Sequence, residues 1–245
     1  DGNAGPAMSL VQVFFAGGGV VATLMGSLFI ARGFPYQNFF ILFLGLAVIL
    51  LFMILRVNFP PVKSAQPEFK VDEKKTVKNS PLKAMTILMV CMILSATFQS
   101  IMTTWTPTFA IDAKNMAEAQ GVSMLSAYQI GSVTGAFVLA YLLRKFNTTT
   151  FMVLNPFFAG LFVIMILFVS HPVLTVMGLF GIGFFQGVYF SLCINMGGII
   201  FAEKAGAATG AIGTVNMLGF SIMITLTGWF VEKVGVFELM VGVVF

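Results

Sequence analysis

The sequence predicts an all-α polytopic membrane protein, a bundle of about eight transmembrane helices. Of its 245 residues, 58% are hydrophobic and only 9% are charged, whereas soluble globular domains carry roughly a quarter charged residues. The chain therefore lacks the charged surface that a soluble domain of this size needs. Its apolar runs are continuous rather than alternating, which excludes an outer-membrane β-barrel. At about 20 residues per crossing plus short connections, there is room for about eight spans.

Seven apolar stretches are long enough to cross a bilayer, and an eighth begins near Val236. Each is bounded by glycine, proline or charged residues, which typically mark helix ends. Pro81 opens the third stretch and Pro172 the sixth, and proline suits the first turn of a helix, where its missing N–H would have no helical acceptor. In chain order the predicted spans are 9–31, 37–56, 84–108, 122–143, 149–170, 173–201 and 206–231.

The distribution of positive charge predicts how these spans are oriented. If the spans alternate in direction, ten of the thirteen Lys and Arg residues fall on one side of the membrane, and seven of the ten lie between Arg56 and Lys83. Because cytoplasmic connections are enriched in Lys and Arg, we expect the basic segment 57–83 in the cytoplasm and the protein in the plasma (inner) membrane. The segment is polar and contains several prolines, which favours a linker between two helix bundles. A nucleic-acid partner is not expected, because that would require a basic face on a folded, water-exposed domain.

Polar side chains divide the spans into two kinds. The second and fifth are apolar almost throughout and can face lipid, while the others carry Gly, Ser, Thr, Asn or Gln in their interiors and should face protein or water. Such side chains either line a cavity or hydrogen-bond to neighbouring helices, and the sequence leaves both interpretations open. The cavity-lining candidates are Gln99, Thr103 and Trp105 in the third span, Gln129 in the fourth, Gln186, Tyr189 and Asn195 in the sixth, and Asn216 in the seventh.

The absence of charge inside the spans narrows the chemistry of any site. No Asp, Glu, Lys or Arg lies in the interior of a predicted span, so a site built by this chain favours an uncharged polyhydroxylated or amphiphilic ligand. The single histidine, His171, lies in a connection, and the sequence has no serine-hydrolase motif or metal-ligand spacing. Cys91 and Cys193 are interpreted as buried small apolar side chains. We therefore expect no enzyme activity, no metal and no cofactor.

Taken together, these features resemble the major facilitator superfamily from its fifth helix onward, over essentially the whole chain. Ser9 to Gly33 is similar to the fifth helix, and the run Gln99-Ser-Ile-Met-Thr-Thr-Trp-Thr-Pro-Thr-Phe-Ala resembles the end of the seventh helix in the fucose and sugar proton symporter branch. The resemblance implies that residues 1–56 form the last two helices of an N-terminal bundle. It also implies that residues 57–83 form the linker and residues 84–245 a C-terminal bundle truncated in its last helix.

Two segments depart from the patterns of the family. The connection Ala140-Tyr-Leu-Leu-Arg-Lys-Phe-Asn lacks the acid of the cytoplasmic motif, and Gly19-Val-Val-Ala-Thr lacks the proline found in many exporters. The resemblance implies a monomeric secondary active transporter that moves a small neutral solute, sugar-like or a polyol, by alternating access, with proton coupling left open. One alternative is a drug or metabolite exporter of the same superfamily. Another, from a different class, is a membrane receptor that does not transport.

Overall fold

The structure, a computed structural model, describes residues 5–56, 81–143, 145–169, 171–201 and 204–242. These residues form helices and no strand. With α6 and α7 counted together, seven spans among them are long and apolar enough to cross a membrane, which confirms the predicted fold class. Most of the predicted linker lies outside the described residues. The helices are α1 (Gly5–Ala31), α2 (Tyr36–Arg56), α3 (Pro81–Asp112), α4 (Glu118–Leu142), α5 (Thr148–Phe168), α6 (Pro172–Gln186), α7 (Tyr189–Ile200), α8 (Ala205–Val234) and α9 (Val236–Gly242).

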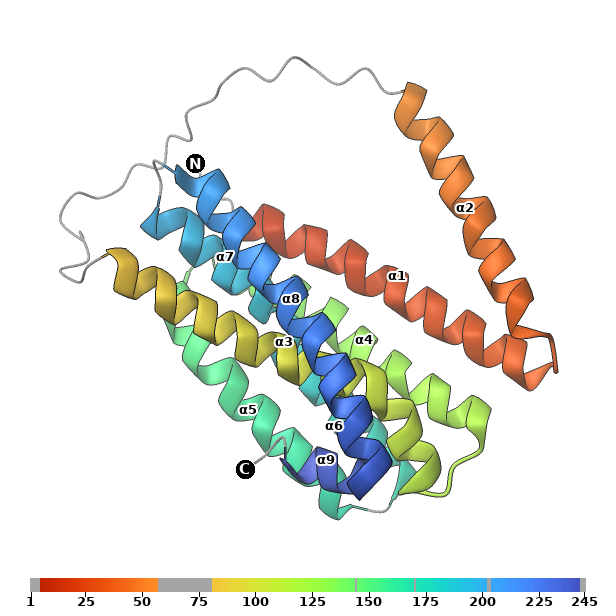
Figure 1. Cartoon of the computed structure of the whole chain (residues 1–245). Helices are drawn as coiled ribbons and strands as arrows, with labels where there is room; N and C mark the ends of the chain where they lie inside the picture. The colour runs from red at the N-terminus through yellow and green to blue at the C-terminus, as the bar shows by residue number, and fades with distance from the viewer. Residues whose placement is uncertain (1–4, 57–80, 144, 170, 202–203, 243–245) are drawn as a thin grey trace.

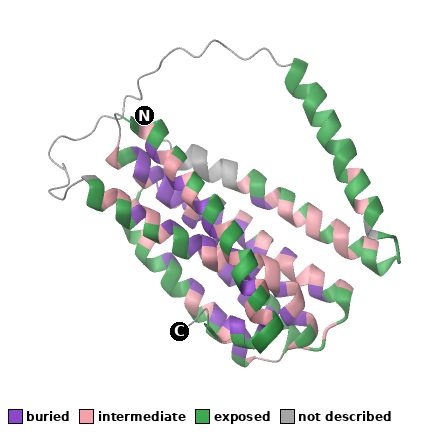
Figure 2. Ribbon diagram, in the orientation of Figure 1, coloured by how far each residue is buried: buried purple, intermediate pink, exposed green. Residues whose placement is uncertain are grey.

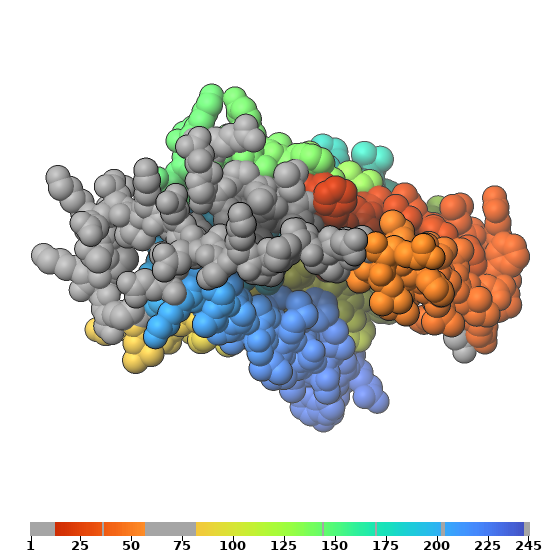
Figure 3. All heavy atoms as spheres, turned by 90° about the horizontal axis from the view of Figure 1, so that it is seen from above, coloured from red at the N-terminus to blue at the C-terminus, as the bar shows by residue number. Residues whose placement is uncertain are grey.

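The helices from α3 to α8 pack together, and α1 lies along one side of this group (Figure 1). Buried residues gather in the middle of the group, whereas α2 is exposed over most of its length (Figure 2). None of the most apolar stretch of α2 is buried against the rest of the described chain. Seen from above, α2 lies at one end of the molecule beside α1 (Figure 3). Its continuous apolar surface is the one that the sequence assigned to lipid.

The helix α3 extends to Asp112, beyond the predicted end at 108, and contains Pro107. Proline has no N–H, so the carbonyl of Thr103 loses its helical partner. Beyond the proline, Phe109 and Ala110 are each 1% exposed and belong to the packed interior. Burial of these side chains keeps the chain helical as far as Asp112.

The sixth predicted span is divided into α6 and α7, which are separated by Gly187 and Val188. The last N–H bond of α6 runs from Gly187 to the carbonyl of Gly183, at 2.8 Å. The two halves also pack in different hydrophobic clusters, since Ile182 of α6 lies in one and Leu192 of α7 in the other. The division therefore falls where the chain passes from one cluster to the next.

Glycines allow α4 and α6 to touch backbone to backbone. A Cβ added to Gly183 would lie 1.9 Å from the carbonyl oxygen of Tyr128, and one added to Gly131 would lie 2.1 Å from that of Phe180. No side chain fits in such a space, so glycine is required at both positions. Gly135 and Gly187, each four residues further along, have equally close neighbours on the facing helix. The two helices therefore form a tightly fitted pair.

Candidate functional site

A groove of about 850 Å³ lies between α3 and α5, with single residues contributed by α6, α7 and α8. Its walls are largely apolar, and Leu239 of the short helix α9 lines it as well. Two of the predicted candidates, Gln186 and Tyr189, line this groove beside Ser95 and Cys91 of α3. The groove thus combines apolar walls with a small group of uncharged polar side chains.

Gln186 is the last residue of α6 and connects it to α3. Its Nε2 donates to Ser95 Oγ at 2.8 Å and approaches the Ser95 carbonyl oxygen at 3.3 Å. Both residues are buried, so the bond is shielded from water. A buried amide that found no partner would cost about 1–3 kcal/mol, which makes this bond part of the packing of the two helices.

Tyr189 begins α7 on the other side of the break. Its side chain packs in the same hydrophobic cluster as Cys91 of α3, and both residues line the groove. Cys193, one turn further along α7, is buried, Cys91 is half-buried, and both thiols are free. The packing of Tyr189 and Cys91 in one cluster therefore joins α7 to α3 at the level of the groove.

Three candidates follow one another along α3, and their side chains have different partners. The amide of Gln99 is half-buried and makes no hydrogen bond to a described residue. Thr103 Oγ1 donates to the backbone oxygen of Gln99 at 2.8 Å. Trp105 Nε1 donates to Thr227 Oγ1 of α8 at 2.9 Å. Of the three, Gln99 has the hydrogen-bonding groups that are available to a ligand.

Gln129 of α4 lies against α1. A Cβ added to Gly19 of α1 would lie 2.8 Å from Cδ of Gln129, so the glutamine side chain rests directly on the glycine. One turn away, the hydroxyls of Thr23 and Ser126 are 2.9 Å apart. The amide of Gln129 makes no hydrogen bond to a described residue. The N–H donors and the carbonyl acceptor of this amide are therefore also available to a ligand.

The two asparagine candidates are buried with an unused acceptor. Asn195 of α7 donates from Nδ2 to Thr148 Oγ1 of α5 at 3.1 Å, and its Oδ1 has no partner. Asn216 of α8 is 4% exposed, and its Oδ1 is also without a partner. Buried amide oxygens are normally satisfied by protein or by bound water, so each of these atoms can accept a hydrogen bond that the described chain does not supply.

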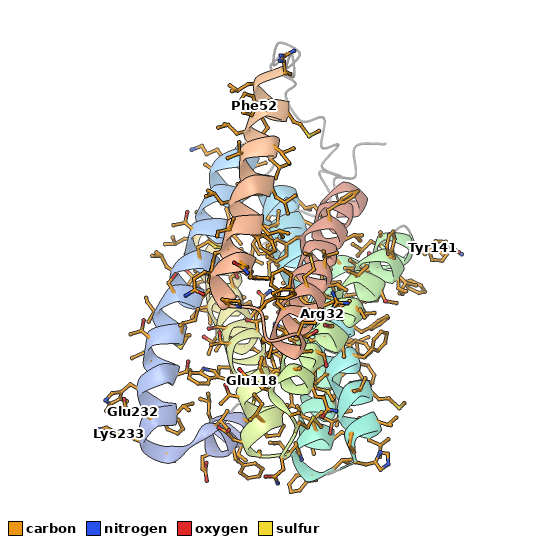
Figure 4. All side chains as sticks on the ribbon, turned by 90° about the vertical axis from the view of Figure 1, so that its right-hand side faces the viewer. Arg32, Phe52, Glu118, Tyr141, Glu232 and Lys233 are labelled. Carbon is orange, nitrogen blue, oxygen red and sulfur yellow. The ribbon has the colours of Figure 1, made fainter. Side chains whose placement is uncertain are left out.

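Within the described helices, charged side chains lie only at the ends. Every Asp, Glu, Lys or Arg in them occupies a first or last turn, and Figure 4 shows Glu232 and Lys233 at the end of α8. His171 precedes α6 and is exposed. Among the described residues no three His, Cys, Asp or Glu side chains come close enough to hold a metal. The interior of this part of the chain consists of neutral groups.

The eight candidates thus occupy several places: two line the groove, and the other six lie elsewhere on α3, α4, α7 and α8. Sequence reasoning placed Ser95, the partner of Gln186, on one polar stripe of the third span with Gln99 and Thr103. It missed Thr148 and Thr227, the partners of Asn195 and Trp105. The contact between Thr23 and Ser126 gave no signal in the sequence, since it joins residues 103 positions apart.

Comparison with known proteins gives two matches. Residues 1–224 match the family model described as Major Facilitator Superfamily. A protein of Bacillus subtilis (strain 168), described as "Uncharacterized MFS-type transporter YfkL", is 28% identical over 239 residues, which cover 94% of this chain and 59% of the relative. The chain thus spans about three fifths of the length of that protein.

Proposed function

Since this chain belongs to the major facilitator superfamily of membrane transporters, we propose that its protein is a secondary active transporter of a small neutral solute, sugar-like or a polyol. Transport follows alternating access, in which two helix bundles rock around a solute site near the middle of the membrane. In this proposal α1 and α2 belong to one bundle and the helices from α3 to α9 to the other. The protein works as a monomer in the plasma membrane, with segment 57–83 in the cytoplasm.

The neutral interior of the spans supports an uncharged solute. An ionic solute or a tightly held ion needs a countercharge in the low-dielectric interior, where an unpaired charge is very costly. The described helices carry charge only in their end turns, whereas their interiors hold amides and hydroxyls. Amides and hydroxyls match the alternating donors and acceptors of a polyhydroxylated molecule.

Three of the candidates are proposed to bind the solute directly. Gln99 and Gln129 have amides without a described partner, and Asn216 has an unused Oδ1. The other five candidates, Thr103, Trp105, Gln186, Tyr189 and Asn195, are proposed to keep the helices around the site in place, since each bonds to its own or a neighbouring helix or packs in the groove. Each direct hydrogen bond is worth about 1 kcal/mol.

Uptake by the full-length protein in proteoliposomes tests this function. We expect saturable flux of at least one sugar or polyol from a radiolabelled panel, with and without an imposed proton gradient. Replacing Gln99 by alanine should raise KM by roughly fivefold, because about 1 kcal/mol of binding is lost. Thr86→Ala on the same helix is the matched control, since the Thr86 hydroxyl bonds to the carbonyl of Leu82 within α3 and is exposed.

The same assay separates the alternatives. If the protein transports amphiphilic drugs but no sugar or polyol, it is a drug exporter of the same superfamily and the proposal is wrong. Saturable binding of a solute without flux of any kind would replace it with the receptor. If the Gln99→Ala variant transports a sugar with an unchanged KM, Gln99 does not bind the solute.

A further inference from the structure

We propose that the end of α4 and the start of α5 form a binding site for an anionic glycerophospholipid. Lys145, in the connection between the two helices, contacts the lipid phosphate. Asn155 of α5, in a pocket next to this connection, donates a hydrogen bond to an ester carbonyl of the same lipid. The pocket shares no lining residue with the groove between α3 and α5, and the proposal does not depend on transport.

The pocket has a volume of about 90 Å³ and lies between α4, α5 and the end of α6. Val138, Leu154 and Phe158 line it and are exposed, so the pocket opens on the outer surface of the bundle, where lipid lies. Its inner wall is the close contact of α4 and α6, since a Cβ added to Gly135 would lie 2.1 Å from the carbonyl oxygen of Phe184. Because backbone atoms make this contact, the inner wall of the pocket is rigid.

Asn155 has the one polar side chain among the described residues that line the pocket. It is 5% exposed, and its amide makes no hydrogen bond to a described residue. An amide left unpaired in apolar surroundings is costly. Water is a poor partner here, because a bound water needs about two to four polar neighbours and the pocket offers a single polar side chain. A lipid ester carbonyl accepts hydrogen bonds, and Nδ2 of Asn155 has two N–H groups to donate.

The size of the pocket excludes a complete small-molecule ligand. Sites for such ligands usually measure about 300–1,000 Å³, and this pocket, at about 90 Å³, is well below that range. The occupant is therefore one part of a larger molecule whose remainder lies outside. A phospholipid meets this condition, because its ester group can enter the pocket while its acyl chains run along the exposed apolar side chains of α4 and α5.

A cation lies at the same end of these two helices. Lys145 is exposed, and its Nζ lies 5.3 Å from the centre of the Tyr141 ring. Figure 4 shows Tyr141 projecting away from the bundle. Phe146, the next residue, packs edge to face on Phe151 with 6.4 Å between the ring centres, and Phe151 lines the pocket. The two phenylalanines therefore connect the position of the cation to the pocket.

The spacing of Lys145 and Asn155 matches the polar part of a phospholipid. Asn155 lies seven residues after Thr148, the first residue of α5, which is about 10 Å along the helix at 1.5 Å per residue. The polar layer of each leaflet is about 5–7 Å thick. With Lys145 at the polar surface, Asn155 lies near the inner limit of this layer, where the ester groups join the acyl chains.

The charge at this end of the bundle favours an anionic lipid. Among the described residues of α3 to α9 and their connections, the charged groups at this end are Lys83, Lys145 and Lys204. The described acids lie at the opposite end, and they are Asp112, Glu118, Glu232 and Glu238. Lysine near a membrane surface attracts anionic lipid, and no described carboxylate opposes this attraction here.

Photo-crosslinking in nanodiscs tests the site. The full-length protein is placed in phosphatidylcholine that contains a phosphatidylglycerol probe with a diazirine near the ester end of one acyl chain. After illumination, we expect mass spectrometry to find adducts on peptides covering 135–142 and 151–158. A phosphatidylcholine probe with the same diazirine should need a roughly fivefold higher fraction for half-maximal labelling, because it lacks the net charge that Lys145 attracts.

Two matched pairs of variants separate the two contacts. Lys145→Gln should raise the half-maximal fraction of the anionic probe roughly fivefold and remove the difference between the probes. Lys83→Gln, at an exposed position on α3, should leave it unchanged. Asn155→Ala should weaken the labelling by both probes roughly fivefold, because both carry the ester. Asn147→Ala is its control, since Asn147 is exposed and its side chain does not cap α5.

Three results would overturn the proposal. The first is equal labelling of these peptides by the two probes in the parent protein. The second is an unchanged half-maximal fraction in either Lys145→Gln or Asn155→Ala. The third is loss of labelling in excess glycerol 3-phosphate, because the site would then bind a soluble phosphate rather than a lipid. None of these measurements uses flux, so they leave the proposed transport function untouched.

Discussion

Glycine has two different roles among the described residues, and the space around each Cα distinguishes them. Gly131, Gly135, Gly183 and Gly187 lie where a Cβ would overlap atoms of the facing helix. Gly160 and Gly213 have nothing within 4 Å. The sequence shows that glycines are numerous in the sixth span, but it cannot show which of them touch another backbone, because that depends on the crossing of α4 and α6.

We expect Gly183→Ala to destabilise the protein by about 1–3 kcal/mol, the usual cost of forcing an extra group into a packed interior. The added Cβ would meet the carbonyl oxygen of Tyr128, and a backbone cannot turn aside as a side chain can. In a Cys91→Ala background a fluorogenic maleimide can follow thermal unfolding, because the remaining thiol, Cys193, is 0% exposed in the folded protein. Gly213→Ala should melt at the same or a higher temperature, since alanine is about 0.8–1.0 kcal/mol better than glycine in a helix. Equal melting of the two variants would show that α4 and α6 do not touch in this way.

The sequence named polar side chains but not their hydrogen-bond partners. Gln186 was predicted to line a cavity, and the structure shows it bonded to Ser95. Trp105 donates a hydrogen bond to Thr227, which lies 122 residues further along the sequence. Residue type and helical spacing show which side chains can form hydrogen bonds. Whether such a side chain binds a ligand or a neighbouring helix depends on contacts between segments that are far apart in the sequence. The sequence of a single helix does not contain that information.

At the scale of helices, the sequence predicted the starts of spans better than their interruptions. The second span was expected at 37–56 and α2 is Tyr36–Arg56, and α9 begins at Val236 as expected. The break after Gln186 and the extension of α3 beyond the predicted end at 108 as far as Asp112 were not predicted. Both depend on burial on either side of the irregular residue, so local propensity alone gave the wrong boundary.

The end of α5 depends on a side chain from another part of the chain. Lys114, in the connection between α3 and α4, donates from Nζ to the carbonyl oxygen of Val169 at 2.8 Å and lies 5.4 Å from the centre of the Phe109 ring. A cation suits the negative end of the helix dipole. Partial burial lowers the pKa of Lys114, because desolvation disfavours the charged amine. This desolvation offsets part of the benefit of the bond.

Lys114→Met should therefore weaken the end of α5 by about 1 kcal/mol. The effect is local, so hydrogen–deuterium exchange of peptides covering 160–169 is the suitable measurement, and we expect faster exchange there than in the parent protein. Lys145→Met serves as the control, since Lys145 is exposed and lies over the Tyr141 ring at 5.3 Å. Equal exchange in the two variants would mean that Lys114 does not cap α5.

At the scale of the whole molecule, the composition of the sequence was enough to predict the fold class. The candidate site could be described only from the contacts between helices. Low charge and long apolar runs were enough to predict a helical membrane bundle, because lipid allows few other solutions. The same statistics gave eight polar candidates but not their grouping into a groove and separate helix contacts. That grouping depends on which helices are neighbours, for example α1 beside α4. The order of the spans along the sequence does not show which helices are neighbours.

The orientation of the bundle follows from charge and is open to a direct test. Ten of the thirteen Lys and Arg residues share one predicted side with the linker, which should therefore be cytoplasmic. In the alanine background for Cys91 and Cys193, Ala117→Cys lies in the connection between α3 and α4, and Asn147→Cys in the one between α4 and α5; both positions are exposed. A membrane-impermeant maleimide should label Ala117→Cys in intact cells and Asn147→Cys only in inside-out vesicles. The reverse pattern would invert the predicted topology and place the linker outside the cytoplasm.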